Sequence, residues 1–463
     1  MEKLYPTLAL AVVVLLVVSP TVSAIHELGI KRTPDGGYVF TWPATFDGER
    51  QSSALIKMNE EESIEWQKVY AKSSQEGLGI GSIDFTKDGG FVLLGTSANS
   101  NSRSPRPTRT YMLRLDQNGN PIWQKELRKE DYQCELFSIT RTEDGGYIAA
   151  GGIGPVPPKQ TKHHDMDAWV VKVNEDGSLA WQYTYGGNLI DWANQIIQTE
   201  DGGYLFVGET TEPTGQQSAG DLWAVKLDET GSIEWQKSYG DPYELEYLCP
   251  DIGYSVIQMS NSDYLVVGTT RSFGEGGGAA GDIWILRLDN QGNIKWQKSY
   301  GGECLDTTPI LIESIGGGYL ISGLTSSFAP WKEVPITEET CYTEKIRNGW
   351  LFEIDEDGRL VWQKVYGPEQ FYGIHGIAQA TKGGYFIRGL VSMQSRIFRI
   401  NKKGKPLGEL DELSVVSTDV TPKNTTTQPA ETSVSPEPVQ VNLVDLDLKV
   451  NETDISDIFL SEN

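Results

Sequence analysis

Carboxylate and aromatic side chains recur together in the segments of this chain that vary most in length. Asp191 is followed directly by Trp192, and similar residues lie in other segments of this kind. Sugars stack on aromatic rings and hydrogen-bond to carboxylates, and acidic groups also attract cationic partners. The candidate ligand-binding residues are Asp131, Asp191, Trp192, Asp251, Asp306 and Trp331. The alternative is that they belong to solvated acidic loops, which a chain of net charge −25 carries in many places.

Signals for catalysis and for metal binding are weak, and we predict neither a catalytic residue nor a metal site. No Ser–His–Asp set stands out among only four histidines. The run His163–Asp165 carries metal-capable side chains, yet the Asp-x-Trp that follows recurs at Asp221 and Asp282 without histidines. Asp355–Gly358 resembles the opening of a calcium loop, but the same turn recurs throughout the chain. A glycosidase pair of carboxylates about 5 to 9 Å apart stays an alternative.

The four cysteines, Cys134, Cys249, Cys304 and Cys341, allow three ways of forming two disulfides. Cys304 and Cys341 fall in the same repeat, so we predict that they pair and hold the longest loop. The rival pairing joins Cys249 to Cys304, which lie in neighbouring repeats.

The N-terminus and the net charge indicate where the protein works. A charged start, an apolar run from Leu8 to Val18 and small residues ending at Ala24 are typical of a secretory signal peptide over residues 1–24. An uncleaved membrane anchor is the alternative, and no later segment is apolar enough to span a membrane. Strong acidity argues against nucleic acid as a partner. We therefore expect a protein that is secreted or held on the outer face of the cell envelope.

These chemical groups are carried by a repeat that occurs seven times. Its Gly-Gly-aromatic signature ends at Tyr38, Phe91, Tyr147, Tyr204, Tyr319 and Tyr385, with a divergent copy ending at Tyr264. Successive aromatics are 53, 56, 57, 60, 55 and 66 residues apart. Periods near this length indicate a propeller, a solenoid or an array.

Each copy has four strand-like segments separated by turn residues. Glu-Asp-Gly-Gly joins the first pair, and an Asx-x-x-Gly turn such as Asp228–Gly231 joins the last pair. One such sheet cannot bury both of its faces, so neighbouring sheets must stack around an axis. The sequence therefore predicts an all-β, seven-bladed β-propeller of four-stranded antiparallel blades over residues 25–410. The approximate blades are 25–70, 71–127, 128–186, 187–240, 241–301, 302–367 and 368–410.

The DGGY…D-x-W…K-L-D-x-x-G-x-x-x-W-Q-K-x-Y-G-G repeat resembles that of secreted prokaryotic β-propeller proteins, most of which have no assigned role. It is distantly similar to WD40-type propellers, without their His and Trp-Asp marks. The turn followed by Trp235 is similar to the tryptophan-docking motif of quinoprotein dehydrogenases. That resemblance implies tryptophans that lock blade to blade, and it carries no catalytic residue. A quinone or calcium cofactor is not supported by any motif.

The C-terminal region changes composition. Residues 411–438 are rich in Ser, Thr and Pro, which predicts an extended, disordered linker. Residues 439–463 form an acidic tail, in which 439–450 alternates and predicts an extra strand, added to the open edge of blade seven or to a partner. The two Asn-x-Thr sequons, Asn424 and Asn451, predict glycosylation in this region.

Taken together, the sequence favours a non-enzymatic binding or interaction module. Its expected partner is a protein or a carbohydrate at the cell surface, bound on the face that carries the variable loops. The alternatives are an extracellular enzyme, either quinoprotein-like or carbohydrate-active, and a structural envelope protein. The sequence does not decide the oligomeric state.

Overall fold

The computed structural model describes most of the repeat region and six short segments of the tail. The described residues are 29–46, 50–73, 76–98, 108–156, 166–187, 190–211, 220–240, 250–273, 281–328, 348–367, 371–391, 394–407, 414–416, 423–424, 430–431, 437–438, 442–445 and 449–452. The predicted signal peptide, residues 1–24, lies outside this part of the chain. No helix within these ranges is long and apolar enough to cross a membrane.

The strands of the first four blades follow one another in chain order. They are β1 (Ile30–Arg32), β2 (Tyr38–Phe46), β3 (Arg50–Met58) and β4 (Ile64–Ser73) in blade one, β5 (Glu76–Phe85), β6 (Phe91–Ala98), β7 (Thr110–Leu115) and β8 (Pro121–Arg128) in blade two, β9 (Tyr132–Arg141), β10 (Tyr147–Pro155), β11 (Asp167–Val173) and β12 (Leu179–Tyr185) in blade three, and β13 (Asp191–Gln198), β14 (Tyr204–Thr210), β15 (Asp221–Leu227) and β16 (Ile233–Tyr239) in blade four.

The remaining blades continue this order. Their strands are β17 (Ile252–Gln258), β18 (Tyr264–Thr270), β19 (Asp282–Leu288) and β20 (Ile294–Tyr300) in blade five, β21 (Asp306–Glu313), β22 (Tyr319–Thr325), β23 (Asn348–Ile354) and β24 (Leu360–Gly367) in blade six, and β25 (Phe371–Gln379), β26 (Tyr385–Val391) and β27 (Gln394–Ile400) in blade seven.

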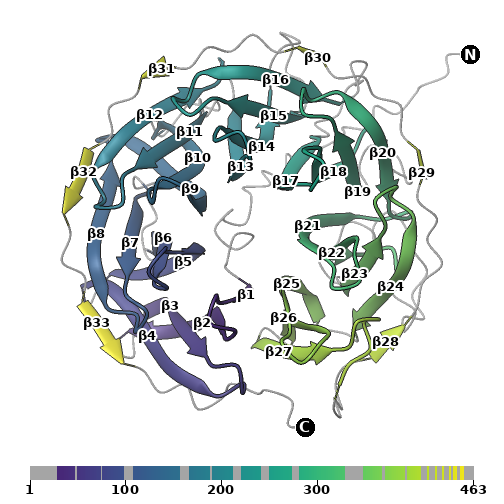
Figure 1. Cartoon of the computed structure of the whole chain (residues 1–463), viewed down its shortest axis with the longest axis horizontal. Helices are drawn as coiled ribbons and strands as arrows, with labels where there is room; N and C mark the ends of the chain where they lie inside the picture. The colour runs from purple at the N-terminus through teal and green to yellow at the C-terminus, as the bar shows by residue number, and fades with distance from the viewer. Residues whose placement is uncertain are drawn as a thin grey trace, which may run out of the picture.

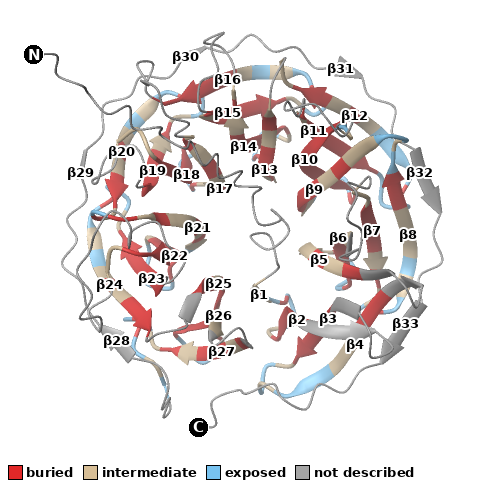
Figure 2. Cartoon of the chain, turned by 180° about the vertical axis from the view of Figure 1, so that it is seen from behind, coloured by how far each residue is buried: buried red, intermediate tan, exposed pale blue. Residues whose placement is uncertain are grey.

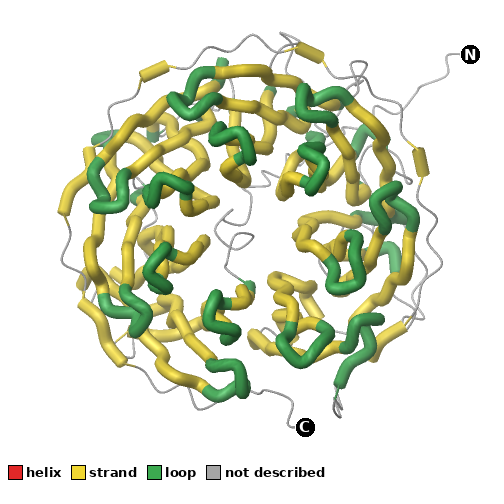
Figure 3. The backbone as a smooth tube through the Cα atoms, viewed as in Figure 1, coloured by secondary structure: helices red, strands yellow, loops and turns green. Residues whose placement is uncertain are grey.

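The seven sheets stand around a common axis, as the repeat predicts (Figure 1). Neighbouring strands within each blade pair antiparallel, and the first strand of each blade is innermost while the fourth lies at the outer rim (Figure 3). Blades one and two are further joined into one sheet, because Ala71 pairs with Gly77 and Ser73 with Glu76. The predicted all-β, seven-bladed propeller is confirmed.

The Asp-Gly-Gly turn sets the start of every second strand. In blade three, Gly145 has a φ of +87°, which glycine adopts without strain, and its N–H donates to the carbonyl of Thr142. Asp144 binds the Lys172 Nζ at 2.8 Å and accepts the Gly146 N–H at 2.9 Å. Burial opposes ionisation of Asp144, but the hydrogen bonds from Lys172 and Thr142 outweigh it and lower its pKa. The turn and the third strand are thus held in register.

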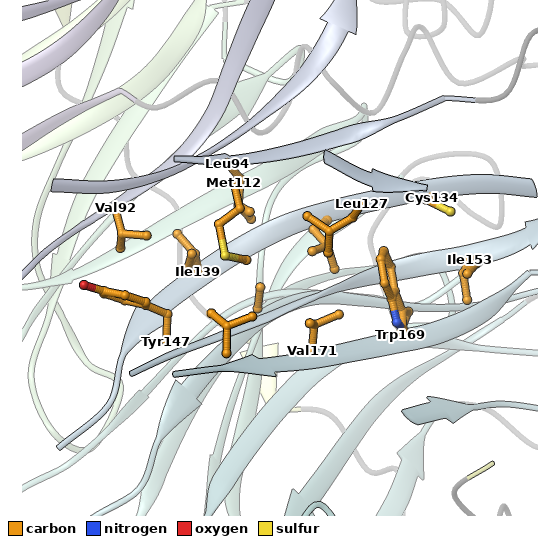
Figure 4. Packing of buried hydrophobic residues seen from close by; sticks show 13 residues of the cluster. Val92, Leu94, Met112, Leu127, Cys134, Ile139, Tyr147, Ile153, Trp169 and Val171 are labelled. Atoms are coloured by element: carbon orange, nitrogen blue, oxygen red, sulfur yellow. The ribbon is translucent and has the colours of Figure 1, made fainter. Parts of the chain in front are cut away.

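The apolar core lies between blades, where Figure 2 shows the strands as buried. One cluster joins Val92, Met112 and Leu127 of blade two to Ile139 and Trp169 of blade three (Figure 4). Other clusters of the same kind lie between successive blades. This arrangement follows from the repeat, because a single four-stranded sheet leaves both faces to be covered by its neighbours.

Tryptophan and tyrosine side chains of each fourth strand lock it to the next blade, as the resemblance implies. The Trp235 Nε1–H donates to the Asn290 carbonyl at 3.0 Å, and the Tyr239 hydroxyl donates to the Gly292 carbonyl at 2.7 Å. A Cβ added at Gly292 would lie 2.8 Å from the Trp235 ring, and this glycine has a φ of +77°. The glycine is therefore required both by the turn and by the tryptophan that packs on it.

Replacing Tyr185 by phenylalanine tests this lock. The Tyr185 hydroxyl is buried and donates to the Gly231 carbonyl of the next blade at 2.7 Å. We expect the free energy of unfolding to fall by about 1 to 2 kcal/mol, because the buried carbonyl loses its donor while the ring stays in place. Urea unfolding measures the change; the result would count against the lock if Tyr185→Phe matched the wild type.

The ends of the ring meet through side-chain packing. Ile30 and Phe40 of blade one share a cluster with Ala378 and Phe386 of blade seven. The Thr381 N–H donates to the Tyr38 hydroxyl oxygen at 2.7 Å, and the Arg399 guanidinium lies 3.0 Å from the Glu62 carboxylate. No described strand of one of these two blades pairs with a strand of the other.

The tail differs from the expected arrangement. Its described segments are extended, but each is a short strand paired with a blade: β28 (Ser414–Val416), β29 (Lys423–Asn424), β30 (Ala430–Glu431), β31 (Glu437–Pro438), β32 (Asn442–Asp445) and β33 (Lys449–Glu452). The predicted strand addition by 439–450 does occur, but its predicted place on blade seven is wrong. Asn442–Asp445 pairs with β8 of blade two, and Lys449–Glu452 pairs with β4 of blade one.

Candidate functional site

A cavity of about 460 Å³ lies on the axis of the ring, lined by residues of all seven innermost strands. In blades two to seven the pairing of the innermost strand with the second strand is interrupted, so that one or two residues are left without a pairing partner. The interruptions fall at Gly81, Phe137, Asn194, Tyr254, Thr308 with Pro309, and His375, and all of these residues line the cavity. A bulge of this kind redirects side chains, and bulges are common next to functional sites.

Polar side chains beside the bulges join neighbouring innermost strands around the cavity. The Asn194 Nδ2–H donates to the Gly253 carbonyl at 2.8 Å, and the Val256 N–H donates to the Gln195 Oε1 at 2.6 Å. The Ile196 N–H donates to the Ser138 Oγ at 3.2 Å in the same way. The cavity wall is therefore held by hydrogen bonds from blade to blade.

Aromatic side chains occupy one side of this wall. The rings of Phe137 and Trp192 are tilted, with their centroids 5.4 Å apart. Gly152 makes room for the indole, since a Cβ there would lie 2.4 Å from the Trp192 ring. Burial raises the pKa of Tyr254 to about 12, with a further contribution from the Glu209 charge. The Tyr254 hydroxyl is therefore neutral at physiological pH and can both donate and accept a hydrogen bond.

Three of the predicted site residues occupy equivalent places at the start of the innermost strands. Asp191, Asp251 and Asp306 are fully buried, and the N–H of each donates to a carbonyl just before the third strand of the preceding blade, at 2.7, 2.7 and 2.6 Å. Each lies close to the aspartate that begins this third strand. For example, a Cβ at Gly301 would lie 2.1 Å from the Asp282 Oδ1 and 2.9 Å from the Asp306 Oδ2. The carboxylates thus form pairs at successive blade junctions.

Burial and mutual repulsion keep these acids partly protonated. Burial raises the pKa of Asp251 to about 6 and that of Asp306 to about 7. Burial and the Asp306 charge raise the pKa of Asp282 to about 8. For Glu209, burial and the charges of Asp191 and Asp251 raise the pKa to about 7.

The structure places the other predicted residues separately. Asp131 is exposed in the link between β8 and β9, with a φ of +59°, and its carbonyl accepts the Val156 N–H at 2.7 Å. Trp331 lies outside the described residues. The aspartates do not converge on one point, because they lie at successive junctions, and none of the predicted residues is part of the cavity lining.

Sequence reasoning missed the residues that do line the cavity, among them Phe137, Asn194, Tyr254 and His375. A signal was present. In the aligned copies a variable residue precedes a small or polar residue and a branched apolar one, as in Phe137-Ser-Ile and Tyr254-Ser-Val. Variation at one place within an otherwise regular strand is typical of a position that packing does not fix.

The cysteine predictions are resolved in part. Cys304 is disulfide-bonded, whereas Cys134 is a free, buried thiol whose pKa burial raises to about 11. The two partners considered for Cys304, namely Cys341 and Cys249, both lie outside the described residues. So does the run His163–Asp165, and no group of three or more metal-binding side chains is found within the described ranges.

Comparison with known proteins adds two distant structures. No family model and no curated protein matches the chain. A crystal structure of a protein of unknown function from Dyadobacter fermentans DSM 18053 has 11% sequence identity and a TM-score of 0.45, covering 75% of this chain and 96% of that one. Sqt1 from Chaetomium thermophilum has 12% identity and a TM-score of 0.32, covering 73% of this chain and 86% of its own. The assignment to the β-propeller architecture rests on the seven sheets themselves.

Proposed function

We propose that this propeller is a non-enzymatic binding protein that takes a neutral sugar into the cavity on its axis. The observation that carries the proposal is the convergence of unlike bulge residues from six blades on one space of about 460 Å³. That volume is within the range of small-molecule sites. Residues that only filled the core would have no reason to differ in chemical type from blade to blade.

The chemistry of the lining supports a neutral, hydroxyl-bearing ligand. Phe137 and Tyr254 offer aromatic surface, while Asn194 and His375 carry polar groups. The charged residues of the lining are Lys31 and Asp84, whose Nζ and Oδ1 lie 3.9 Å apart, so they largely offset each other. A sugar presents both an apolar face and hydroxyl groups, and this combination matches the lining.

Binding is better supported than hydrolysis. A glycosidase needs two carboxyl groups that flank the substrate bond. The paired acids Asp282 and Asp306 are buried at a blade junction and do not line the cavity, and Asp84 lies beside Lys31. Our proposal also includes secretion or display at the cell surface, which follows from the signal-like N-terminus alone.

Calorimetric titration of the full chain with a panel of neutral mono- and oligosaccharides tests this function. We expect His375→Ala and Phe137→Leu each to weaken binding at least tenfold, which corresponds to about 1.4 kcal/mol. The matched control is Asp131→Asn, an exposed residue of the same face, which should change affinity less than twofold. Failure of every saccharide to bind, or release of new reducing ends, would overturn the proposal. Binding that depends on Asp131 and not on the cavity residues would move the site to the outer loops.

A further inference from the structure

The tail runs along the outside of the ring and contacts one blade after another. β28 pairs with β24 of blade six, β29 with β20 of blade five, β30 with β16 of blade four, β31 with β12 of blade three, β32 with β8 of blade two, and β33 with β4 of blade one. All six pairings are antiparallel, and Figure 1 shows these strands at the periphery. The tail therefore visits six blades in reverse chain order.

The register of these pairings is the same in every blade. In each outer strand, the residue three positions after the shared tryptophan pairs with one tail residue. The pairs are Val365 with Val416, Ser299 with Lys423, Ser238 with Ala430, Thr184 with Glu437, Glu126 with Val444, and Val69 with Asn451. Each step along the tail is seven residues. Six contacts of equal register and equal spacing distinguish a specific pairing from a casual one.

The tail sequence repeats with the same period. From residue 417 it reads STDVTPK, NTTTQPA, ETSVSPE, PVQVNLV and DLDLKVN, and the last residue of each heptad is the pairing residue. The fourth position is Val420, Thr427, Val434, Val441 or Leu448, all of which favour extended chain. The sequence and the pairing thus share one frame, and seven extended residues reach about 23 Å from one blade to the next.

Proline explains why three of the tail strands are shorter than the others. β29, β30 and β31 each begin directly after a proline, at Pro422, Pro429 and Pro436. Proline has no N–H to donate to a strand ladder. Where the same heptad position carries Leu443 or Val450, the tail strand extends to four residues.

We propose that this heptad-repeat tail is a belt that holds the propeller ring closed from outside. Blades one and seven meet through side-chain contacts such as Arg399 with Glu62 and Tyr38 with Thr381, without a described strand shared between them. The tail leaves blade seven, follows the outer edges and reaches blade one, which is the neighbour of blade seven. Opening at this junction requires the belt to be stretched or stripped from its outer strands. The belt also covers strand edges that would otherwise be open to aggregation.

Disulfide trapping in the full chain tests the frame and the occupant. Ser238→Cys with Ala430→Cys places two thiols directly opposite each other, and we expect oxidised glutathione to join them within one chain. The matched control, Ser238→Cys with Lys423→Cys, is one heptad out of frame and should give less than a tenth of that product. Equal trapping of both pairs would overturn the frame. Trapping between two chains would show that the outer edge takes the tail of a second copy and would overturn the belt.

Hydrogen exchange tests whether the belt closes the ring. Val444→Pro with Asn451→Pro removes the N–H groups of two pairing residues on blades two and one. We expect the Thr381 amide, at the junction of blades one and seven, to exchange at least tenfold faster, with the amides of β14 in blade four unchanged. The control is Leu443→Pro, a position at which other heptads carry proline, and it should have a smaller effect. An unchanged Thr381 rate in the double variant would overturn the closing role.

Discussion

Replacement of Trp223 by alanine is expected to lower the free energy of unfolding by about 4 kcal/mol, the cost of removing a large aromatic side chain from a packed core. Trp223 is fully buried on the third strand of blade four. It belongs to a cluster that includes Tyr185 of blade three and Phe206 of its own blade. The Trp223 and Phe206 rings meet edge to face, with their centroids 5.3 Å apart. Alanine would therefore leave a cavity between two blades.

Urea unfolding of the full chain measures this loss. The control is Val361→Ala, because Val361 is 58% exposed and should change the unfolding free energy by less than about 0.5 kcal/mol. Trp223→Phe keeps an aromatic ring at the same place and should recover a large part of the loss. If Trp223→Ala destabilised the protein no more than Val361→Ala, the apolar core could not lie between the blades.

The propeller itself could be predicted because each repeat carries its own local instructions. The signature aromatics Tyr38, Phe91, Tyr147, Tyr204, Tyr264, Tyr319 and Tyr385 are the first residues of the seven second strands. Turn chemistry places each of them: an Asp accepts hydrogen bonds beside a glycine with positive φ. These effects act within a few residues, so sequence alone can reveal them.

The cavity could not be predicted in the same way. A bulge depends on how two strands pair, and no single residue type marks it here: the position is Gly81 in blade two, Phe137 in blade three and His375 in blade seven. The sequence therefore directed attention to the acidic and aromatic loop residues. Whether those residues bind a ligand stays a prediction.

Long-range pairing also limited the interpretation of individual residues. Asp306 was considered as a loop carboxylate, but it lies at the start of β21 beside Asp282 of the preceding blade. In the tail, Asn424 and Asn451, the predicted glycosylation sites, lie in strands that pair with blades five and one. Partners this distant in the chain are set by ring geometry, which local composition does not encode.

The buried acid pair at the junction of blades five and six should make the protein less stable as the pH rises from 5 to 9. In the unfolded chain, Asp282 and Asp306 ionise near pH 4. In the folded chain burial raises the pKa of Asp282 to about 8 and that of Asp306 to about 7. The folded state therefore holds more protons than the unfolded state across this range. Stability that the neutral pair contributes is fully present below pH 4 and is lost as the pH rises to about 8.

Urea unfolding at pH 5, 7 and 9 should show a fall on the order of 3 kcal/mol in the wild type. Asp282→Asn removes the ionisable group with the highest raised pKa, so most of this fall should disappear in that variant. The control is Asp289→Asn in the following turn. Although some burial opposes it, hydrogen bonds from Asn293 and Gln291 lower the pKa of Asp289, which should therefore affect stability only at acidic pH. Wild-type stability that rises from pH 5 to 9, or a fall that Asp282→Asn leaves unchanged, would show that these carboxyls are not held protonated by the fold.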